Sequence, residues 1–314
     1  MYYPLKLQKF TNKNINKIDI DIDLIEKLMK KNILECPYNT FPYIFDNNSK
    51  QSQKKYNSGN CVAMSINLQN MLKENGIKSY LIPATIPKMY YSPDFLNISH
   101  VAVIIFKNEN EAYIVDPAFY FLNPIKVDVR NDNVNTIKWK NIYKGIEEHL
   151  KYKLNYSDEN HIFNKYQHIP NDTYSVEAYE NTDDKWYYYL IEVKNPDKAI
   201  SSFNLTSKKY PFLADLDSNL DLKLYIKFFD KDNLMIKYNG DKIYTGHFEK
   251  IPDEIIQLIH DDMINILGNN YYTFFRLPSN VDNKIYNLND RLVKKTIKKK
   301  QRKRVKFNKT IKHI

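Results

Sequence analysis

Three side chains with complementary chemistry, Cys61, His100 and Asp116, lie within residues 58–119. A thiolate is a nucleophile, an imidazole can take up and return its proton, and a carboxylate can hold the imidazole in one orientation. The three residue types in this order predict nucleophilic catalysis at Cys61, with His100 as the base and Asp116 as the orienting group.

Cys61 stands at the expected start of a helix. Asn60 is a residue type that caps helices, Gly76 supplies a stop, and apolar side chains recur between them at helical spacing, at Met64, Leu68, Met71 and Leu72. Backbone N–H groups at a helix N-terminus favour the thiolate, which is the reactive form of a cysteine.

His100 and Asp116 belong to a predicted hairpin, in which HVAVIIF and EAYIVD are the strands and KNENE supplies the turn. A turn centred on Asn108 would place residues 100 and 116 directly opposite each other. Their Cβ atoms would then be about 4.5–5.5 Å apart on one face of the hairpin. A register shifted by one residue would place the two side chains on opposite faces.

Each of these residues has a simpler interpretation when taken alone. A cysteine on a helix is often a small buried hydrophobe, and a histidine at a strand start is often an ordinary hydrogen-bonded polar group. An aspartate before proline often begins a turn. Their combination favours catalysis, and both interpretations stay open on spacing alone.

The stretch resembles the core of the arylamine N-acetyltransferases, which are relatives of the transglutaminases and papain-like cysteine enzymes. That family has a Cys-His-Asp triad in this order, and its aspartate ends a strand in a motif similar to VDPAFYFLNPI here. In papain-like proteases the histidine lies about 130–150 residues downstream, which does not fit Cys61 and His100. Residues 36–41 and 186–216 also resemble family segments, so the likeness covers about residues 15–250.

The sequence departs from the family pattern at two places. The Arg-Gly-Gly before the family's cysteine is replaced by Asn57-Ser58-Gly59, and two polar positions after it are occupied by Ala63 and Ser65. These changes predict a different set of supporting contacts around the nucleophile. Glycines in the segment that approaches the family's cofactor are replaced by Pro117, Ala118 and Tyr120. The second departure therefore changes residues on which the use of acetyl-CoA depends in the family.

The resemblance and the strand patterns together predict an α+β fold. We expect an N-terminal helical region carrying the nucleophile helix (1–78), an antiparallel barrel or curled sheet carrying His100 and Asp116 (79–195), an α/β lid (196–285) and a basic, disordered tail (286–314). Single helices are expected at residues 22–34 and 251–267. Further strands are predicted at SYLIPATI, NTIKWK, KWYYYLIEV, LKLYIKFF, LMIKYNG and DKIYTGHF.

Other residues that could do chemistry receive structural interpretations. Cys36 is expected to be a buried thiol, with a disulfide to Cys61 as the alternative. The cluster of Tyr187, Tyr188 and Tyr189 is assigned to sheet packing, with an acceptor pocket as the alternative. The histidines lack metal-ligand spacing, so no metal site is predicted.

The C-terminal residues 291–314 contain twelve Lys and Arg and no Asp or Glu. The rest of the chain has 35 basic and 37 acidic side chains, so the net charge of +10 comes from this tail. Such a run is typical of a nucleic-acid arm or nuclear-localisation signal that binds polyanions, and a solvated tail without a partner is the alternative.

No apolar run reaches membrane-spanning length, and no signal-peptide pattern opens the sequence. Together with only two cysteines, this predicts a reduced intracellular protein without a membrane partner. The expected location is the cytoplasm, or the nucleus or a virion if the tail acts there. The bias toward Asn, Lys, Ile and Tyr indicates an AT-rich genome, such as that of a large DNA virus.

The resemblance implies a ping-pong acyltransferase that moves an acyl group from acetyl-CoA or another acyl-CoA to a small-molecule amine through Cys61. Residues that bind the CoA are not identified by the sequence. A cysteine protease or transglutaminase-like amide hydrolase on the same triad is the first alternative. The second is a non-catalytic structural or nucleic-acid-associated protein that uses the basic tail.

Overall fold

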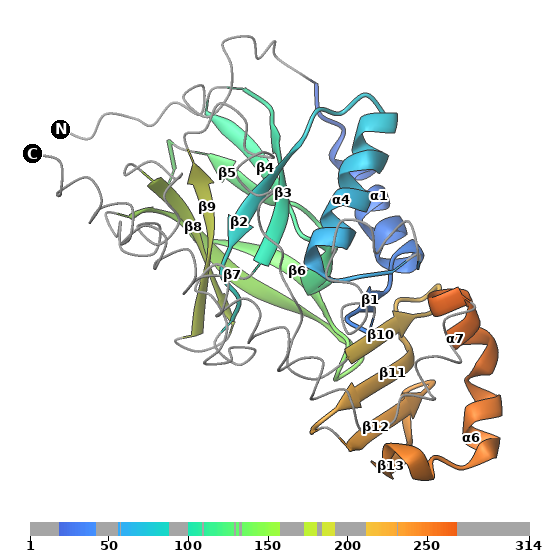
Figure 1. The fold of residues 1–314 in the computed structure, drawn as a ribbon. Coiled ribbons are helices and arrows are strands. Elements are labelled where there is room, and N and C mark those ends of the chain that lie inside the picture. Colours follow the sequence, from blue (N-terminus) through green and yellow to red (C-terminus); the bar gives the residue numbers. More distant parts are fainter. Residues whose placement is uncertain are drawn as a thin grey trace, which may run out of the picture.

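The computed structural model describes residues 19–41, 56, 58–87, 100–108, 110–128, 130–131, 134–157, 173–180, 184–191, 212–230 and 232–268. These residues form an α+β structure with two antiparallel sheets, a curled one and a smaller one, and helices beside each of them (Figure 1). This confirms the predicted fold class. No helix within these ranges is long and apolar enough to cross a membrane.

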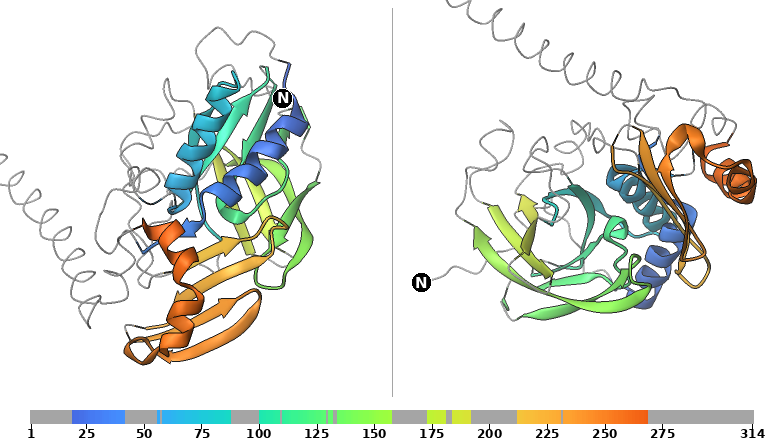
Figure 2. Two further views of the ribbon diagram at one scale, coloured as in Figure 1. Left: turned by 90° about the vertical axis from the view of Figure 1, so that its right-hand side faces the viewer. Right: turned by 90° about the horizontal axis from the view of Figure 1, so that it is seen from below.

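The larger sheet has eight strands in the order β5-β4-β3-β2-β9-β8-β7-β6. Its strands are β2 (Tyr80–Ala84), β3 (His100–Phe106), β4 (Glu111–Val115), β5 (Ile125–Asp128), β6 (Asn135–Asn141), β7 (Ile146–Ser157), β8 (Thr173–Glu180) and β9 (Asp184–Ile191). Seen from below, the sheet curls round on itself (Figure 2). A bridge between Phe121 and Trp139 connects the segment before β5 to β6 at the other edge, and this contact closes the curl.

The smaller sheet has five strands in the order β1-β10-β11-β12-β13. Its strands are β1 (Tyr38–Asn39), β10 (Phe212–Leu216), β11 (Leu222–Phe228), β12 (Asn233–Tyr238) and β13 (Asp241–His247). The predicted turn at Asn239 and Gly240 is confirmed, since both residues have positive φ and join paired strands. Because β1 pairs with β10, this sheet combines residues from the first and third predicted regions. The predicted domain boundaries themselves stay a prediction.

The two faces of the smaller sheet pack against different helices. Phe212, Ala214 and Tyr225 face the main core with α1 (Ile22–Glu35) and α4 (Cys61–Glu74). The alternate residues Leu213, Leu224 and Ile226 pack with the side chains of α7 (His260–Leu267). Helices α1 and α4 therefore lie between the two sheets, as the view from below shows (Figure 2).

The prediction of a single helix at residues 251–267 is wrong. The structure has α6 (Asp253–Leu258) and α7, separated at Ile259. Ile259 has φ −96° and ψ 1°, outside the helical range, and its side chain is fully buried. The break lets α7 turn its apolar side chains onto the smaller sheet together with Ile259.

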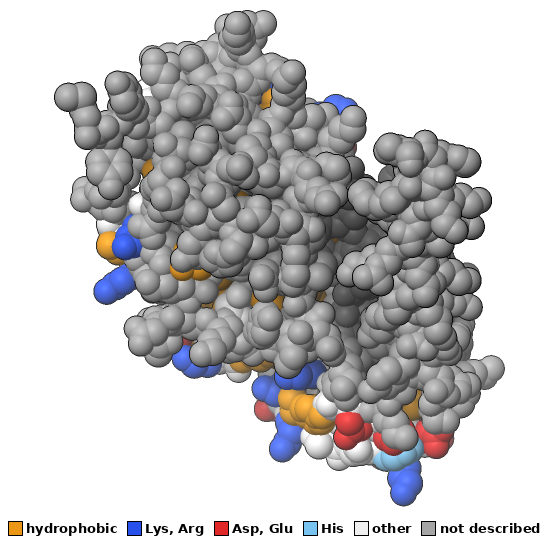
Figure 3. All heavy atoms as spheres, turned by 60° about the vertical axis from the view of Figure 1, so that its left-hand side comes forward, with side chains coloured by type: hydrophobic (Ala, Val, Ile, Leu, Met, Phe, Trp, Pro, Cys, Tyr) orange, Lys and Arg blue, Asp and Glu red, His pale blue; other side chains and the backbone are white. Residues whose placement is uncertain are grey.

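On the face shown in Figure 3, the Lys and Arg side chains lie at several separate places. The basic tail at residues 286–314 lies outside the described residues. Its role in binding nucleic acid or another polyanion stays a prediction.

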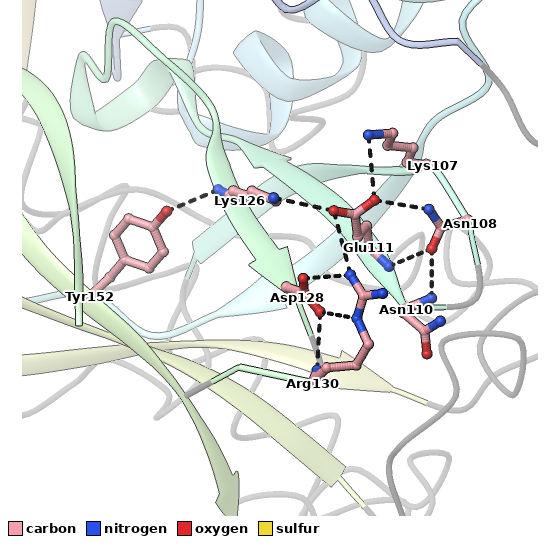
Figure 4. Close-up of polar contacts among 8 residues, drawn as sticks. All are labelled: Lys107, Asn108, Asn110, Glu111, Lys126, Asp128, Arg130 and Tyr152. Atoms are coloured by element: carbon pink, nitrogen blue, oxygen red, sulfur yellow. Dashed lines mark hydrogen bonds and ion pairs between the residues drawn. The ribbon is translucent and has the colours of Figure 1, made fainter. Parts of the chain in front are cut away.

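The hairpin of β3 and β4 differs from prediction in its register. Pairing of Val103 with Val115 and of Phe106 with Ala112 centres the turn on residue 109. Figure 4 shows the cause: the Asn108 side chain accepts hydrogen bonds from the N–H groups of Asn110 and Glu111, at 2.8 and 2.9 Å. This turn moves the partner of each residue by two positions, which leaves the face of every side chain unchanged.

Glu111 also anchors the hairpin to β5 through charge. Its carboxylate lies 3.4 Å from Lys107 Nζ and 3.2 Å from Lys126 Nζ (Figure 4). Arg130 pairs with Asp128 at 2.7 Å beside it. These partly exposed ion pairs connect the hairpin that carries His100 and Asp116 to β5, and each contributes little to stability individually.

We predict that Leu68→Ala lowers the free energy of unfolding by about 2–5 kcal/mol, because it leaves a cavity in the core beside α4. Leu68 is completely buried, whereas Leu258 in α6 is 50% exposed. Leu258→Ala is the matched control, with an expected change of about 0.5 kcal/mol or less. Urea unfolding measures both, and equal losses would contradict the core assignment.

Candidate active site

Cys61 is the first residue of α4, as the sequence predicted. The Asn60 side chain caps the helix and accepts hydrogen bonds from the N–H groups of Val62 and Ala63, at 3.0 and 3.4 Å. The turn before the cap is fixed by Gly59, whose N–H and C=O both bond to the segment that contains β1. Cys61 is buried, with an exposed fraction of 5%.

The structure brings the three predicted residues together. His100 Nε2 lies 2.6 Å from Asp116 Oδ2, and both side chains are buried. The Cys61 side chain is close enough to the imidazole for its charge and hydrogen bonding to raise the pKa of His100. Because Nε2 faces the carboxylate, Nδ1 is the ring nitrogen available to the thiol. Asp116 follows β4 and reaches His100 diagonally, since extending the observed register would set it opposite Ala102.

The charge state of His100 follows from these contacts. Burial acts to lower the pKa of His100, because it disfavours the charged ring. The charge of Asp116 acts in the opposite direction and raises this pKa. The charge of a Cys61 thiolate and hydrogen bonding to both residues raise it further. The net effect raises the pKa of His100 from 6.5 to about 10. The ring is therefore an imidazolium at neutral pH, the form that stabilises a neighbouring thiolate.

Asp116 is held by groups from two further segments. Its Oδ1 accepts a hydrogen bond from the N–H of Ala118 at 3.2 Å, in the short 3-10 helix η3 (Pro117–Phe119). Its Oδ2 accepts a second hydrogen bond, from the hydroxyl of Tyr188 at 2.6 Å. Both oxygens of the buried carboxylate are thus satisfied, as a buried charge requires.

Tyr188 is the residue that the sequence analysis missed. Its backbone pairs with Ala84 of β2, and Ala84 in turn pairs with His100, so the three residues lie side by side across three strands. The small Ala84 lets Tyr188 and His100 reach the same carboxylate. Trp186 Nε1 donates to the Tyr188 hydroxyl at 3.4 Å. Burial, followed by the charge of Asp116, holds the pKa of Tyr188 well above 10, so the phenol remains a donor.

The segment after Asp116 is fixed by closure of the curled sheet. Tyr120 adopts left-handed backbone angles, φ 57° and ψ 35°, at a position where the resemblance places a glycine. Such a conformation costs about 1–3 kcal/mol for a residue with a side chain. The Tyr120 carbonyl accepts a hydrogen bond from the N–H of Lys140 in β6 at 3.0 Å. The contact with β6 therefore holds this backbone in place.

An aromatic side chain covers the imidazole. The ring centroid of Phe119 lies 4.5 Å from that of His100, and Phe119 also contacts Trp186 at 5.8 Å. Phe119 is partly exposed, so it separates the buried ion pair from solvent on this side. Restricted water access strengthens the charge interactions beneath it.

Cys36 lies outside this group. Both cysteines are free, so the alternative of a disulfide between them is wrong. Cys36 is fully buried, and burial raises the pKa of its thiol to about 12. It is the buried thiol that the sequence predicted. Among the residues whose structure is described, no group of three His, Cys, Asp or Glu could hold a metal ion.

No protein-family model matches the chain, and no curated protein matches its sequence. Solved structures of arylamine N-acetyltransferases are similar in fold. The M. smegmatis enzyme shares 12% identity over 82% of this chain and 88% of its own, with a TM-score of 0.47. The Mycobacterium abscessus enzyme shares 11% over 88% and 93%, with a TM-score of 0.49.

The Bacillus cereus enzyme NAT3, which has a Cys-His-Glu catalytic triad, shares 17% identity over 79% of this chain and 93% of its own, with a TM-score of 0.46. These proteins belong to the family that the sequence motifs resemble. Because their identities are below 25% and their TM-scores below 0.5, we base the functional proposal on the geometry of the site.

We predict that Tyr188→Phe lowers the free energy of unfolding by about 1–3 kcal/mol, because the buried Asp116 carboxylate loses one hydrogen-bond donor. Tyr244→Phe is the matched control, since the Tyr244 hydroxyl donates to the carbonyl oxygen of His247 in the other sheet. That bond is only partly buried, so a loss below about 1 kcal/mol is expected. Urea unfolding that gave equal losses would contradict the role of Tyr188.

A second prediction concerns pH. Because the folded-state pKa of His100 is raised above its ordinary value, its contribution to stability is complete below pH 6.5 and is lost as the pH rises to about 10. The difference in free energy of unfolding between the wild type and His100→Gln should therefore shrink across this range. Urea unfolding of both proteins at a series of pH values measures it. A constant difference would show that His100 is not charged in the folded protein.

Proposed function

We propose that the protein is a cysteine-dependent acyltransferase that moves an acyl group from a CoA thioester to a small-molecule amine. The observation that carries the proposal is the buried pair of His100 Nε2 and Asp116 Oδ2 at 2.6 Å, with Cys61 near enough to raise the pKa of the imidazole. A nucleophile, a base and an orienting carboxylate in mutual contact are what acyl transfer through a covalent intermediate requires.

In the first half-reaction, Cys61 Sγ attacks the carbonyl carbon of the thioester after its proton has passed to His100. The bond between the acyl carbon and the CoA sulfur breaks, and the departing sulfur takes a proton from the imidazolium. In the second half-reaction an amine attacks the acyl-cysteine and gives a proton to His100. The bond from Sγ to the acyl carbon then breaks, which restores the free enzyme and leaves an amide.

Asp116 has a positioning and charge-balancing role in this scheme. Its contact with Nε2 keeps Nδ1 directed toward Cys61 and stabilises the imidazolium. The hydroxyl of Tyr188 and the N–H of Ala118 keep the carboxylate in place. The base is therefore oriented before substrate arrives.

The oxyanion that forms during attack needs a donor near Sγ. The N–H groups of Val62 and Ala63 are bonded to the side chain of Asn60. The N–H of Cys61 itself is therefore the first-turn donor that we assign to the oxyanion. Its place at the helix N-terminus adds the favourable end of the helix dipole.

Mass spectrometry after incubation with a panel of acyl-CoA thioesters tests the proposal. We expect an acyl adduct on Cys61 in the wild type and none in Cys61→Ala. Cys36→Ala is the matched control and should keep the adduct, because Cys36 is fully buried and its thiol has a pKa of about 12.

A peptide library distinguishes acyl transfer from attack on amides, which the same three side chains could also perform. Cleavage of peptides by the wild type but not by Cys61→Ala, with no adduct from any thioester, would replace the proposal with an amide hydrolase. The absence of any Cys61-dependent reaction in both assays would contradict catalysis at this site.

A further inference from the structure

The thiol and the imidazole come from elements that are far apart in the chain. Cys61 begins α4, and His100 begins β3. Packing of apolar side chains holds the helix against the sheet. A hydrogen bond between the two elements, which has a preferred distance and angle, adds a directional constraint on where Cys61 lies relative to His100.

Ser65 makes such a bond. It lies four residues after Cys61, which places it one turn further along the same side of α4. Ser65 is fully buried, and its hydroxyl donates to the carbonyl oxygen of Val101 at 2.9 Å. Val101 is the neighbour of His100 in β3. The bond therefore joins the turn of helix that carries the nucleophile to the residue beside the base.

The Val101 carbonyl, which accepts this bond, has a cross-strand partner that cannot donate a hydrogen bond to it. Val101 pairs with Pro83 of β2, and proline has no N–H to donate. The Val101 carbonyl thus receives no hydrogen bond from its cross-strand partner. The Ser65 hydroxyl supplies a donor there, and an alanine at this position could not. The bond satisfies a buried carbonyl and fixes the helix with one contact.

We propose that Ser65 is a positioning residue that sets the contact between Cys61 and His100. It touches neither the thiol nor a substrate in this scheme, and acts by fixing α4 on β3. The inference deepens the proposed function, because it concerns the same nucleophile. Its test uses thiol alkylation, so it can fail or succeed independently of any acyl donor.

The experiment compares Ser65→Ala with the wild type. Iodoacetamide alkylation of Cys61 is followed by peptide mass mapping across a pH series, and the rate at low pH divided by the rate at high pH reports the thiol–imidazole contact. We expect this ratio to fall by about tenfold in Ser65→Ala, equivalent to the loss of one buried hydrogen bond. Thermal unfolding identifies the temperature range in which each variant is folded.

Ser79→Ala is the matched control. Ser79 is also largely buried, but its hydroxyl has no hydrogen-bond partner among the residues that the structure describes. It follows the C-terminal end of α4, whereas Cys61 is at the N-terminal end of that helix. This variant should keep the wild-type ratio, which separates the effect of the Ser65 bond from that of removing any buried hydroxyl.

Ser65→Thr keeps a hydroxyl and is expected to retain most of the wild-type ratio. An unchanged ratio in folded Ser65→Ala would overturn the proposal, and so would equal losses in the Ala and Thr variants. If Ser65→Ala fails to fold while Ser65→Thr folds, the bond serves the fold as a whole and the positioning role is also refuted.

Discussion

The buried ion pair between His100 and Asp116 is the interaction on which the rest of the site depends. A charged pair removed from water is costly unless each partner is fully satisfied. The structure meets this requirement with donors from two other segments, the hydroxyl of Tyr188 in β9 and the N–H of Ala118 in η3. The contacts with this one carboxylate fix the positions of β3, β4, β9 and η3 relative to one another. They also hold the imidazole toward Cys61.

The smaller sheet supports the nucleophile from the other side. Ser58, which is fully buried, accepts a hydrogen bond from Asn39 Nδ2 at 3.0 Å. Its hydroxyl proton has two acceptors within reach, the carbonyl oxygens of Tyr56 at 3.0 Å and of Ile266 in α7 at 3.3 Å. Asn39 belongs to β1, which pairs with β10. The turn that presents Cys61 is therefore built on the smaller sheet and its helix, so this lobe is part of the site's framework.

Much of the fold could be predicted from local patterns. The helix with Cys61 at its start lies where its apolar periodicity placed it, and the strands HVAVIIF and EAYIVD lie where their apolar runs placed them. Strands β7 and β8 were not predicted, although LKYKLNYS and TYSVEAY alternate between apolar and polar residues as a half-buried strand does. The single helix expected at residues 251–267 is broken at Ile259, since burial of that side chain on the sheet outweighs continuous helical periodicity.

The sequence by itself singled out the three side chains, because a helix pattern starts at Cys61 and a hairpin pattern places His100 and Asp116 on one face. The sequence placed the centre of the hairpin turn at Asn108, and the actual centre is residue 109. The predicted faces of the side chains are unchanged, because the partner of each residue moves by two positions and side chains in a strand alternate with a period of two. Only the tertiary structure decided the supporting contacts. Which tyrosine reaches Asp116 depends on the pairing of β9 with β2, and that pairing joins residues about a hundred positions apart, beyond the range of any local pattern.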